Sequence, residues 1–193
     1  ATEDGNQKRL HDCYAFSHTI SSFDLHLFNE GKLHQGYHVL GSHHTRLDGT
    51  PGMRFAVWAP NARRVSVVGD FNRWDGRTHL MSAHGSSGVW EIFIPDLAQG
   101  TLYKFEILSV NGELLVKTDP YASAFEMRPN TAALAGVNTT HIWQDEQWMS
   151  RRSHWDWLKQ PLNIYEIHAG SWKRHPDGRF YNYRELAEHL IPY

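Results

Sequence analysis

The chain has 193 residues and a formal net charge of −2, and this composition excludes several classes of function. A pI near 6.7 argues against the clustered lysine and arginine of a nucleic-acid-binding surface. The single cysteine, Cys13, rules out an intramolecular disulfide framework. No apolar run approaches the length of a membrane span, and residues 1–30 lack a signal-peptide pattern. We therefore expect a cytoplasmic protein whose partners include neither nucleic acid nor membrane.

A short sequence in the N-terminal segment is similar to a later stretch of the chain. Asp12-Cys13-Tyr14-Ala15 is similar to Asp119-Pro120-Tyr121-Ala122. One interpretation is that residues 1–33 hold the end of a preceding, related β-sandwich followed by a connector. A chance match in an unstructured N-terminus is the other interpretation, and the residues alone favour neither.

The densest strand pattern lies between residues 53 and 118. Two short apolar runs flank Ala59-Pro60-Asn61-Ala62, a turn-like sequence that predicts an opening hairpin. Asn111-Gly112 predicts a second, tight hairpin. Further strands are expected at 89–94, 102–108, 114–118 and 139–143. Short strands separated by such turn sequences indicate a mainly β fold, an immunoglobulin-like antiparallel sandwich over residues 34–146.

Trp74 lies in a loop that follows the apolar run ending at Gly69. A large aromatic ring beside Asn and Asp suits sugars, because their C–H faces stack on apolar rings while their hydroxyls need polar partners. Composition alone favours the other interpretation, in which Trp74 caps the core of the sandwich. Fourteen histidines invite a metal hypothesis, but their spacing, including His34, His38, His43 and His44, fits no known ligand pattern, so no metal site is expected.

The chain changes character after the sandwich. Residues 147–162 are mixed charged and aromatic and are interpreted as a linker. Residues 163–168 predict a short strand, and Asn182 with Glu185 three positions later predicts the start of a helix. One strand and one helix over residues 163–193 indicate the first βα unit of a parallel α/β domain, so we expect a piece of a longer protein.

Three segments together resemble bacterial 1,4-α-glucan (glycogen) branching enzymes. They are the run Val57-Trp58-Ala59-Pro60-Asn61-Ala62 continuing to Arg77, the segment from Leu102 to Ala122, and Ile164-Tyr165-Glu166-Ile167-His168-Ala169-Gly170-Ser171-Trp172-Lys173-Arg174. The first two are similar to debranching enzymes as well, whereas the third favours branching enzymes. The alternatives are therefore a debranching hydrolase and a stand-alone glycogen-targeting module.

The resemblance implies a retaining glycosyl transfer that needs no cofactor. A carboxylate forms a glycosyl-enzyme, a second carboxylic acid protonates the leaving oxygen, and a glucan 6-hydroxyl replaces water as the acceptor to make α-1,6 branches. In that family the catalytic groups lie on later strands of a (β/α)8 barrel. None of them is expected in this chain, which by itself should be inactive and whose partner would be the missing catalytic barrel.

The resemblance also implies an α-glucan-binding face. Related modules stack glucose on two tryptophans beside a lysine and an asparagine. Trp74 and Lys104 match the first aromatic and the lysine, and Asn72 is a further candidate for substrate binding, whereas Glu113-Leu114 stands where the second aromatic is expected. Asn138 and Thr140 are further candidates for contact with sugar hydroxyls. Weak glucan binding and a mainly scaffolding role both remain open.

Overall fold

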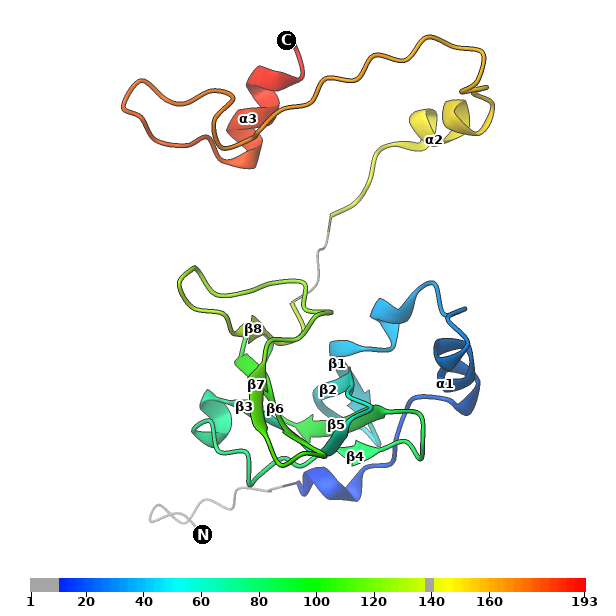
Figure 1. Ribbon diagram of the computed structural model, residues 1–193, viewed down its shortest axis with the longest axis vertical. Helices are drawn as coiled ribbons and strands as arrows, with labels where there is room; N and C mark the ends of the chain where they lie inside the picture. The colour runs from blue at the N-terminus through cyan, green and yellow to red at the C-terminus, as the bar shows by residue number, and fades with distance from the viewer. Residues whose placement is uncertain (1–10, 138–140) are drawn as a thin grey trace. The chain divides into compact units, whose positions relative to one another are not determined.

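The computed structural model describes residues 11–137 and 141–193, which fall into two compact units (Figure 1). Unit 1 is Ala1–Thr140 and unit 2 is His141–Tyr193. Among the described residues, no helix is long and apolar enough to cross a membrane. The domain boundaries expected at residues 33, 146 and 162 stay predictions.

Unit 1 is built from two antiparallel sheets. The first has the order β1-β2-β5-β4, and the second has the order β3-β6-β7 with β8 paired to β6 (Figure 1). The strands are β1 (Gly41–Leu47), β2 (Thr50–Trp58), β3 (Ala62–Gly69), β4 (Ser82–Ala83), β5 (Val89–Pro95), β6 (Leu102–Ser109), β7 (Leu114–Lys117) and β8 (Ala133–Leu134). This arrangement confirms the expected mainly β fold.

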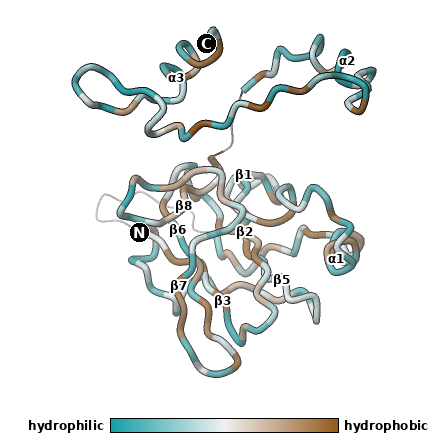
Figure 2. Tube along the Cα trace, turned by 45° about the horizontal axis from the view of Figure 1, so that its top comes forward, coloured by the Kyte–Doolittle hydropathy of each residue, from teal (hydrophilic) through white to brown (hydrophobic). Residues whose placement is uncertain are grey.

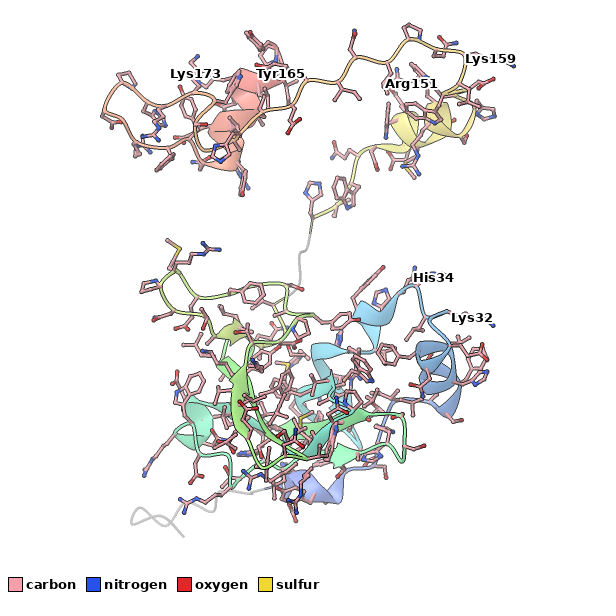
Figure 3. The ribbon with its side chains drawn as sticks, in the orientation of Figure 1. Lys32, His34, Arg151, Lys159, Tyr165 and Lys173 are labelled. Atoms are coloured by element: carbon pink, nitrogen blue, oxygen red, sulfur yellow. The ribbon has the colours of Figure 1, made fainter. Side chains whose placement is uncertain are left out.

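The core lies between the two sheets, where side chains from both layers meet (Figure 3). Alternation along β2 and β5 turns Phe55 and Ile92 to this interior, while β6 supplies Tyr103 and Phe105. Phe55 and Tyr103 pack edge to face, with ring centroids 4.8 Å apart. All four side chains are buried, so apolar burial across the interface stabilises the sandwich.

The outer face of the first sheet is covered as well, by the segment that precedes β1. Helix α1 (Ser22–Asn29) begins at Ser21, whose hydroxyl accepts the backbone N–H of Asp24. Ile20 and Leu40 pack on Ala56 and Val89 from this side. Because both faces are covered, β2 carries a continuous buried run instead of the alternation typical of a half-exposed strand.

Two sequence expectations about strand pairing are wrong. The runs on either side of Pro60-Asn61 form no hairpin, because β2 pairs with β1 and β5 whereas β3 pairs with β6. The turn therefore carries the chain from one sheet to the other. The expected strand at 139–143 is replaced by β8 at Ala133–Leu134, and the described part of the expected range, from His141 onward, is not in a strand.

The Asn111-Gly112 hairpin, in contrast, is confirmed. It joins β6 to β7, and the amide of Gly112 donates to the carbonyl of Ser109 over 3.0 Å. Gly112 has φ +84°, a left-handed conformation that glycine adopts without a steric penalty.

Unit 2 contains two helices, α2 (Glu146–Ser153) and α3 (Tyr183–Leu190). The helix start at Asn182 is confirmed: its side chain accepts two backbone N–H groups and the Glu185 carboxylate accepts the N–H of Asn182. The expected linker over 147–162 contains most of α2. Hydrophilic stretches alternate with short hydrophobic ones along this unit (Figure 2).

The strand expected at 163–168 is wrong. These residues make no ladder, because a strand needs a neighbouring strand to satisfy its backbone groups and the described residues 141–193 contain only an isolated bridge between Arg174 and Phe180. The barrel to which this segment was assigned stays a prediction.

Residues 12–15 and 119–122, which are similar in sequence, also share a local hydrogen bond. The Asp12 carboxylate accepts the backbone N–H of Tyr14 over 2.9 Å, and the Asp119 carboxylate accepts that of Tyr121 over 2.8 Å. The expected preceding sandwich falls mostly on residues 1–10, outside the described residues, and stays a prediction.

Candidate functional site

Trp74 projects from the turn that follows β3. The 3-10 helix Asp70–Asn72 begins this turn, and Arg73 and Trp74 then adopt φ +56° and +59°. Left-handed geometry costs a non-glycine residue about 1–2 kcal/mol, so the surrounding contacts must impose it. The indole Nε1 donates to the Asp70 carboxylate over 2.8 Å, which fixes the orientation of the ring. The side chain is 39 % exposed and presents an apolar surface to solvent.

Asn72 stabilises this turn from within. Its side-chain oxygen accepts the N–H of Gly69 over 3.0 Å, and its amide group donates to the carbonyl of Val67 over 2.9 Å. The same amide nitrogen lies 3.1 Å from Nδ1 of His79. Asn72 therefore stabilises the turn that carries Trp74, while its expected contact with sugar stays a prediction.

Lys104 lies with Trp74 in one open hollow of about 530 Å³. Lys104 extends from β6, and its Nζ donates to the hydroxyl of Thr131 over 2.8 Å. The segment 126–132 closes the opposite side. The hollow is lined by Asp70, Trp74, Leu102, Lys104, Glu126, Pro129, Asn130, Thr131 and Ala132.

The 126–132 segment is held by its own hydrogen bonds. The Glu126 carboxylate accepts the N–H of Ala132 over 2.9 Å and the Asn130 amide over 3.4 Å. The Thr131 carbonyl accepts the hydroxyl of Thr118 over 2.6 Å. The hollow thus has one ammonium, two carboxylates and one amide around an aromatic surface, a donor and acceptor set that suits a neutral polyhydroxylated ligand.

The structure brings together only part of the predicted site. Trp74 and Lys104 share the hollow, whereas Asn138 and Thr140 lie outside the described residues. Leu114, at the position expected for a second aromatic, pairs with Leu108, four residues along β6 from Lys104. At 3.3 Å per residue this is about 13 Å along the sheet, so Leu114 belongs to the opposite end of β6 from the hollow.

Sequence reasoning missed the lining residues Asp70, Glu126, Asn130 and Thr131. The contribution of Glu126, Asn130 and Thr131 depends on where the 126–132 segment folds back, whereas Asp70 belongs to the same turn as Trp74. A polar, turn-forming Pro129-Asn130 pair between the last strands was the available signal.

Comparison with known proteins identifies this architecture. Residues 39–122, which include Trp74 and Lys104, match the family model of carbohydrate-binding module 48 (isoamylase N-terminal domain). Over its whole length the chain is 62 % identical to 1,4-alpha-glucan branching enzyme GlgB of Nitrosomonas europaea and covers 26 % of that protein. The whole chain is thus similar to about a quarter of a 1,4-α-glucan branching enzyme and contains a match to carbohydrate-binding module 48.

Similarity within this branching enzyme family extends further. The chain is 53 % identical over 184 residues to 1,4-alpha-glucan branching enzyme GlgB of Nitrosococcus oceani, with 95 % of the chain and 25 % of that protein covered. It thus spans about a quarter of the length of the curated relatives it matches. The resemblance drawn from the sequence is confirmed.

Among solved structures, the chain is similar to pullulanase type I of Bacillus subtilis complexed with maltose. The identity is 25 %, the coverage is 53 % of this chain and 14 % of that chain, and the TM-score is 0.42.

Proposed function

We propose that unit 1 is an α-glucan-binding module of a glycogen branching enzyme and that it binds glucan in the hollow of Trp74 and Lys104. The half-exposed indole of Trp74, fixed by its hydrogen bond to Asp70 at the edge of this hollow, carries the proposal. A pyranose ring stacks its apolar C–H face on such a surface and bonds its hydroxyls to groups at the rim.

The rim groups are suited to binding rather than to catalysis. Asp70 accepts a hydrogen bond from Trp74, and Glu126 accepts bonds from Ala132 and Asn130. Retaining glycosyl transfer needs a carboxylate free to attack carbon and a second one protonated for the leaving group. Both acids of the hollow serve to hold local structure, so we expect this chain alone to be inactive.

For the whole protein we propose the reaction that its relatives are named for. It would cleave an α-1,4-glucan chain and transfer the segment to a 6-hydroxyl, with a barrel domain supplying the catalytic carboxylates and without a bound cofactor. A near-neutral chain with one cysteine fits a cytoplasmic location for this activity.

A scaffolding role is the second candidate, and one observation favours it. Leu114 replaces the second aromatic and lies at the other end of β6, so the hollow offers one stacking ring where related modules are expected to offer two. A single ring supplies less stacking energy, and under this alternative unit 1 would position the catalytic domain without binding glucan itself.

Isothermal titration of the 193-residue chain with maltoheptaose separates the two candidates. The glucan-binding proposal predicts measurable binding and an increase in Kd of about tenfold for Trp74→Ala, equivalent to about 1.4 kcal/mol of lost stacking. Trp148→Ala, which removes a partly exposed tryptophan of unit 2, should leave the Kd unchanged. Absence of binding in the unmodified chain would favour the scaffold.

A further inference from the structure

A second hollow, of about 370 Å³, opens beside the other sheet. Its volume falls within the range of small-molecule pockets. The N-terminal end of β1 and the segments that precede β1 and follow β7 form it. Its lining residues are Tyr37, His38, Ser42, His43, Tyr121, Ser123 and Val137. None of them lines the Trp74 hollow, which belongs to the sheet β3-β6-β7.

Two tyrosine rings supply the apolar surface of this second hollow. Tyr37 is 53 % exposed and Tyr121 is 38 % exposed. Exposed aromatic rings flanked by hydroxyl and imidazole groups make the amphipathic surface that sugar rings require. Tyr37 also lies against the imidazole of His38, with ring centroids 4.4 Å apart, which restricts its orientation.

Tyr121 is held in place by buried groups. Its backbone N–H donates over 2.8 Å to Asp119, which is almost fully buried and accepts the hydroxyl of Tyr103 over 2.5 Å. Gly41, at φ +96°, allows the close approach of this segment, because a Cβ there would lie 3.1 Å from the Cβ of Tyr121. The backbone that carries this ring is therefore pre-organised, which lowers the ordering cost of binding a ligand.

His43 offers a defined acceptor. Its Nε2 lies 2.9 Å from the carbonyl oxygen of Leu40, and since a carbonyl only accepts, Nε2 carries the proton and Nδ1 of the neutral ring is an acceptor. Burial lowers the pKa of His43, so the ring is neutral at pH 7. A neutral imidazole and the hydroxyl of Ser123 suit ligand hydroxyls and do not favour an anion.

We propose that this hollow is a second carbohydrate site, which takes a short neutral α-glucan segment between Tyr37 and Tyr121. The lining residues include no lysine, arginine, aspartate or glutamate. The neighbouring guanidinium of Arg54 is buried and donates to the carbonyls of Val39 and His38, so it is already bonded within the protein. The proposal shares its ligand class with the function proposed above but not its residues. Two sites on opposite sheets of one module would bind separate chains or branches of the same glucan particle and increase avidity.

The test is an amide-resolved NMR titration of the 193-residue chain with maltoheptaose in the Trp74→Ala variant. Because this variant lacks the aromatic surface of the first hollow, the shifts report sugar binding at the second hollow alone. A failure of the second site can therefore be distinguished from a failure of the function proposed for the Trp74 hollow. We expect saturable shifts of the Ser42, His43 and Ser123 amides, and at least a fivefold higher Kd from these shifts when Tyr37→Ala is added. Tyr183→Ala, an exposed tyrosine of unit 2, is the control and should leave that Kd unchanged.

Three results would overturn the proposal. One is the absence of shifts at these amides at saturating maltoheptaose in the Trp74→Ala variant. Another is an unchanged Kd in Tyr37→Ala, whose side chain is exposed enough for the fold to survive its removal. The last is saturable shifts of the same amides with inorganic phosphate in place of sugar, which would assign the hollow to anions.

Discussion

At the scale of single residues, Glu91 is a buried carboxylate that fastens the N-terminal segment to the sandwich. Its side chain is 3 % exposed and accepts the N–H and the hydroxyl of Thr19, over 3.0 and 2.5 Å. On its other side it lies 2.7 Å from Nε2 of His84. Because a buried charge is tolerated only when it is well bonded, these contacts determine whether residues 17–20 stay on the outer face of the first sheet.

Replacing this carboxylate should destabilise the fold in a pH-dependent way. Burial favours the neutral acid, but the bonds from Thr19, His84 and Ile20 outweigh it and hold the pKa of Glu91 below its ordinary value of 4.5. The folded chain then binds this proton less tightly than the unfolded chain. The stabilisation is therefore complete above about pH 4.5 and is lost as the pH falls through the folded pKa.

We thus expect Glu91→Gln to lower the free energy of unfolding by about 2 kcal/mol at pH 7. The gap to the unmodified chain should narrow below pH 4.5. Urea denaturation followed by tryptophan fluorescence across pH 3–7 measures both effects. Glu113→Gln, at an exposed turn position, is the matched control and should cost nothing measurable; a gap independent of pH would contradict the assigned pKa.

Asn72 provides a second residue-scale prediction. Its side chain bonds to Gly69 and Val67 and supports the left-handed turn at Trp74. Asn72→Ala should raise the Kd for maltoheptaose and lower the unfolding free energy by about 1–2 kcal/mol, because buried backbone groups lose their partners. Titration calorimetry and thermal melting give the two values. Weakened binding with unchanged stability would instead indicate that Asn72 contacts the sugar directly.

At the scale of elements, the β6–β7 hairpin depends on the conformation of one turn. Gly112 adopts φ +84°, and a Cβ at this position meets nothing within 4 Å, so the cost of adding one is conformational. Gly112→Ala should lower the unfolding free energy by about 1 kcal/mol with an unchanged denaturant m-value. An unchanged denaturation midpoint would show that this turn does not limit the stability of the sheet.

The elements also show what local sequence can and cannot predict. The Asn111-Gly112 turn and the Asn182 cap were predicted because their signals act within a few residues. The partner of a strand is a non-local property: Pro60-Asn61 indicates a turn, yet the sheet to which each flanking strand belongs depends on β5 and β6. For the same reason residues 163–168 carry a strand-like pattern without forming a strand.

The residues of the candidate site likewise divide into those that a local motif predicts and those that depend on non-local folding. Trp74 was predicted from its loop position and its polar neighbours, and Lys104 from the resemblance, because both belong to continuous motifs within residues 39–122. Asn130 and Glu126 reach the hollow only because the 126–132 segment folds back beside Lys104. The role of Asn72 also required coordinates, since a polar residue beside an aromatic one can bind a ligand or support the turn.

At the scale of the whole molecule, each unit has its own internal contacts, and the two hydrophobic clusters of residues 11–137 lie within unit 1. A chain of residues 1–140 should therefore unfold in one transition. Its melting temperature should equal that of unit 1 in the 193-residue chain. It should also bind maltoheptaose with the same Kd. Calorimetry measures both, and a sandwich that melts earlier or loses its affinity would show that unit 2 contributes to the stability or to the site.

Glucan binding at Trp74 is tested most directly by a crystal structure of the 193-residue chain with maltoheptaose. We predict a glucose ring stacked on the indole of Trp74, with its hydroxyls within hydrogen-bond distance of Lys104 and of the Asn130 side chain. A well-ordered sugar elsewhere with the Trp74 hollow empty, in a crystal where that hollow is open to solvent, would contradict the account.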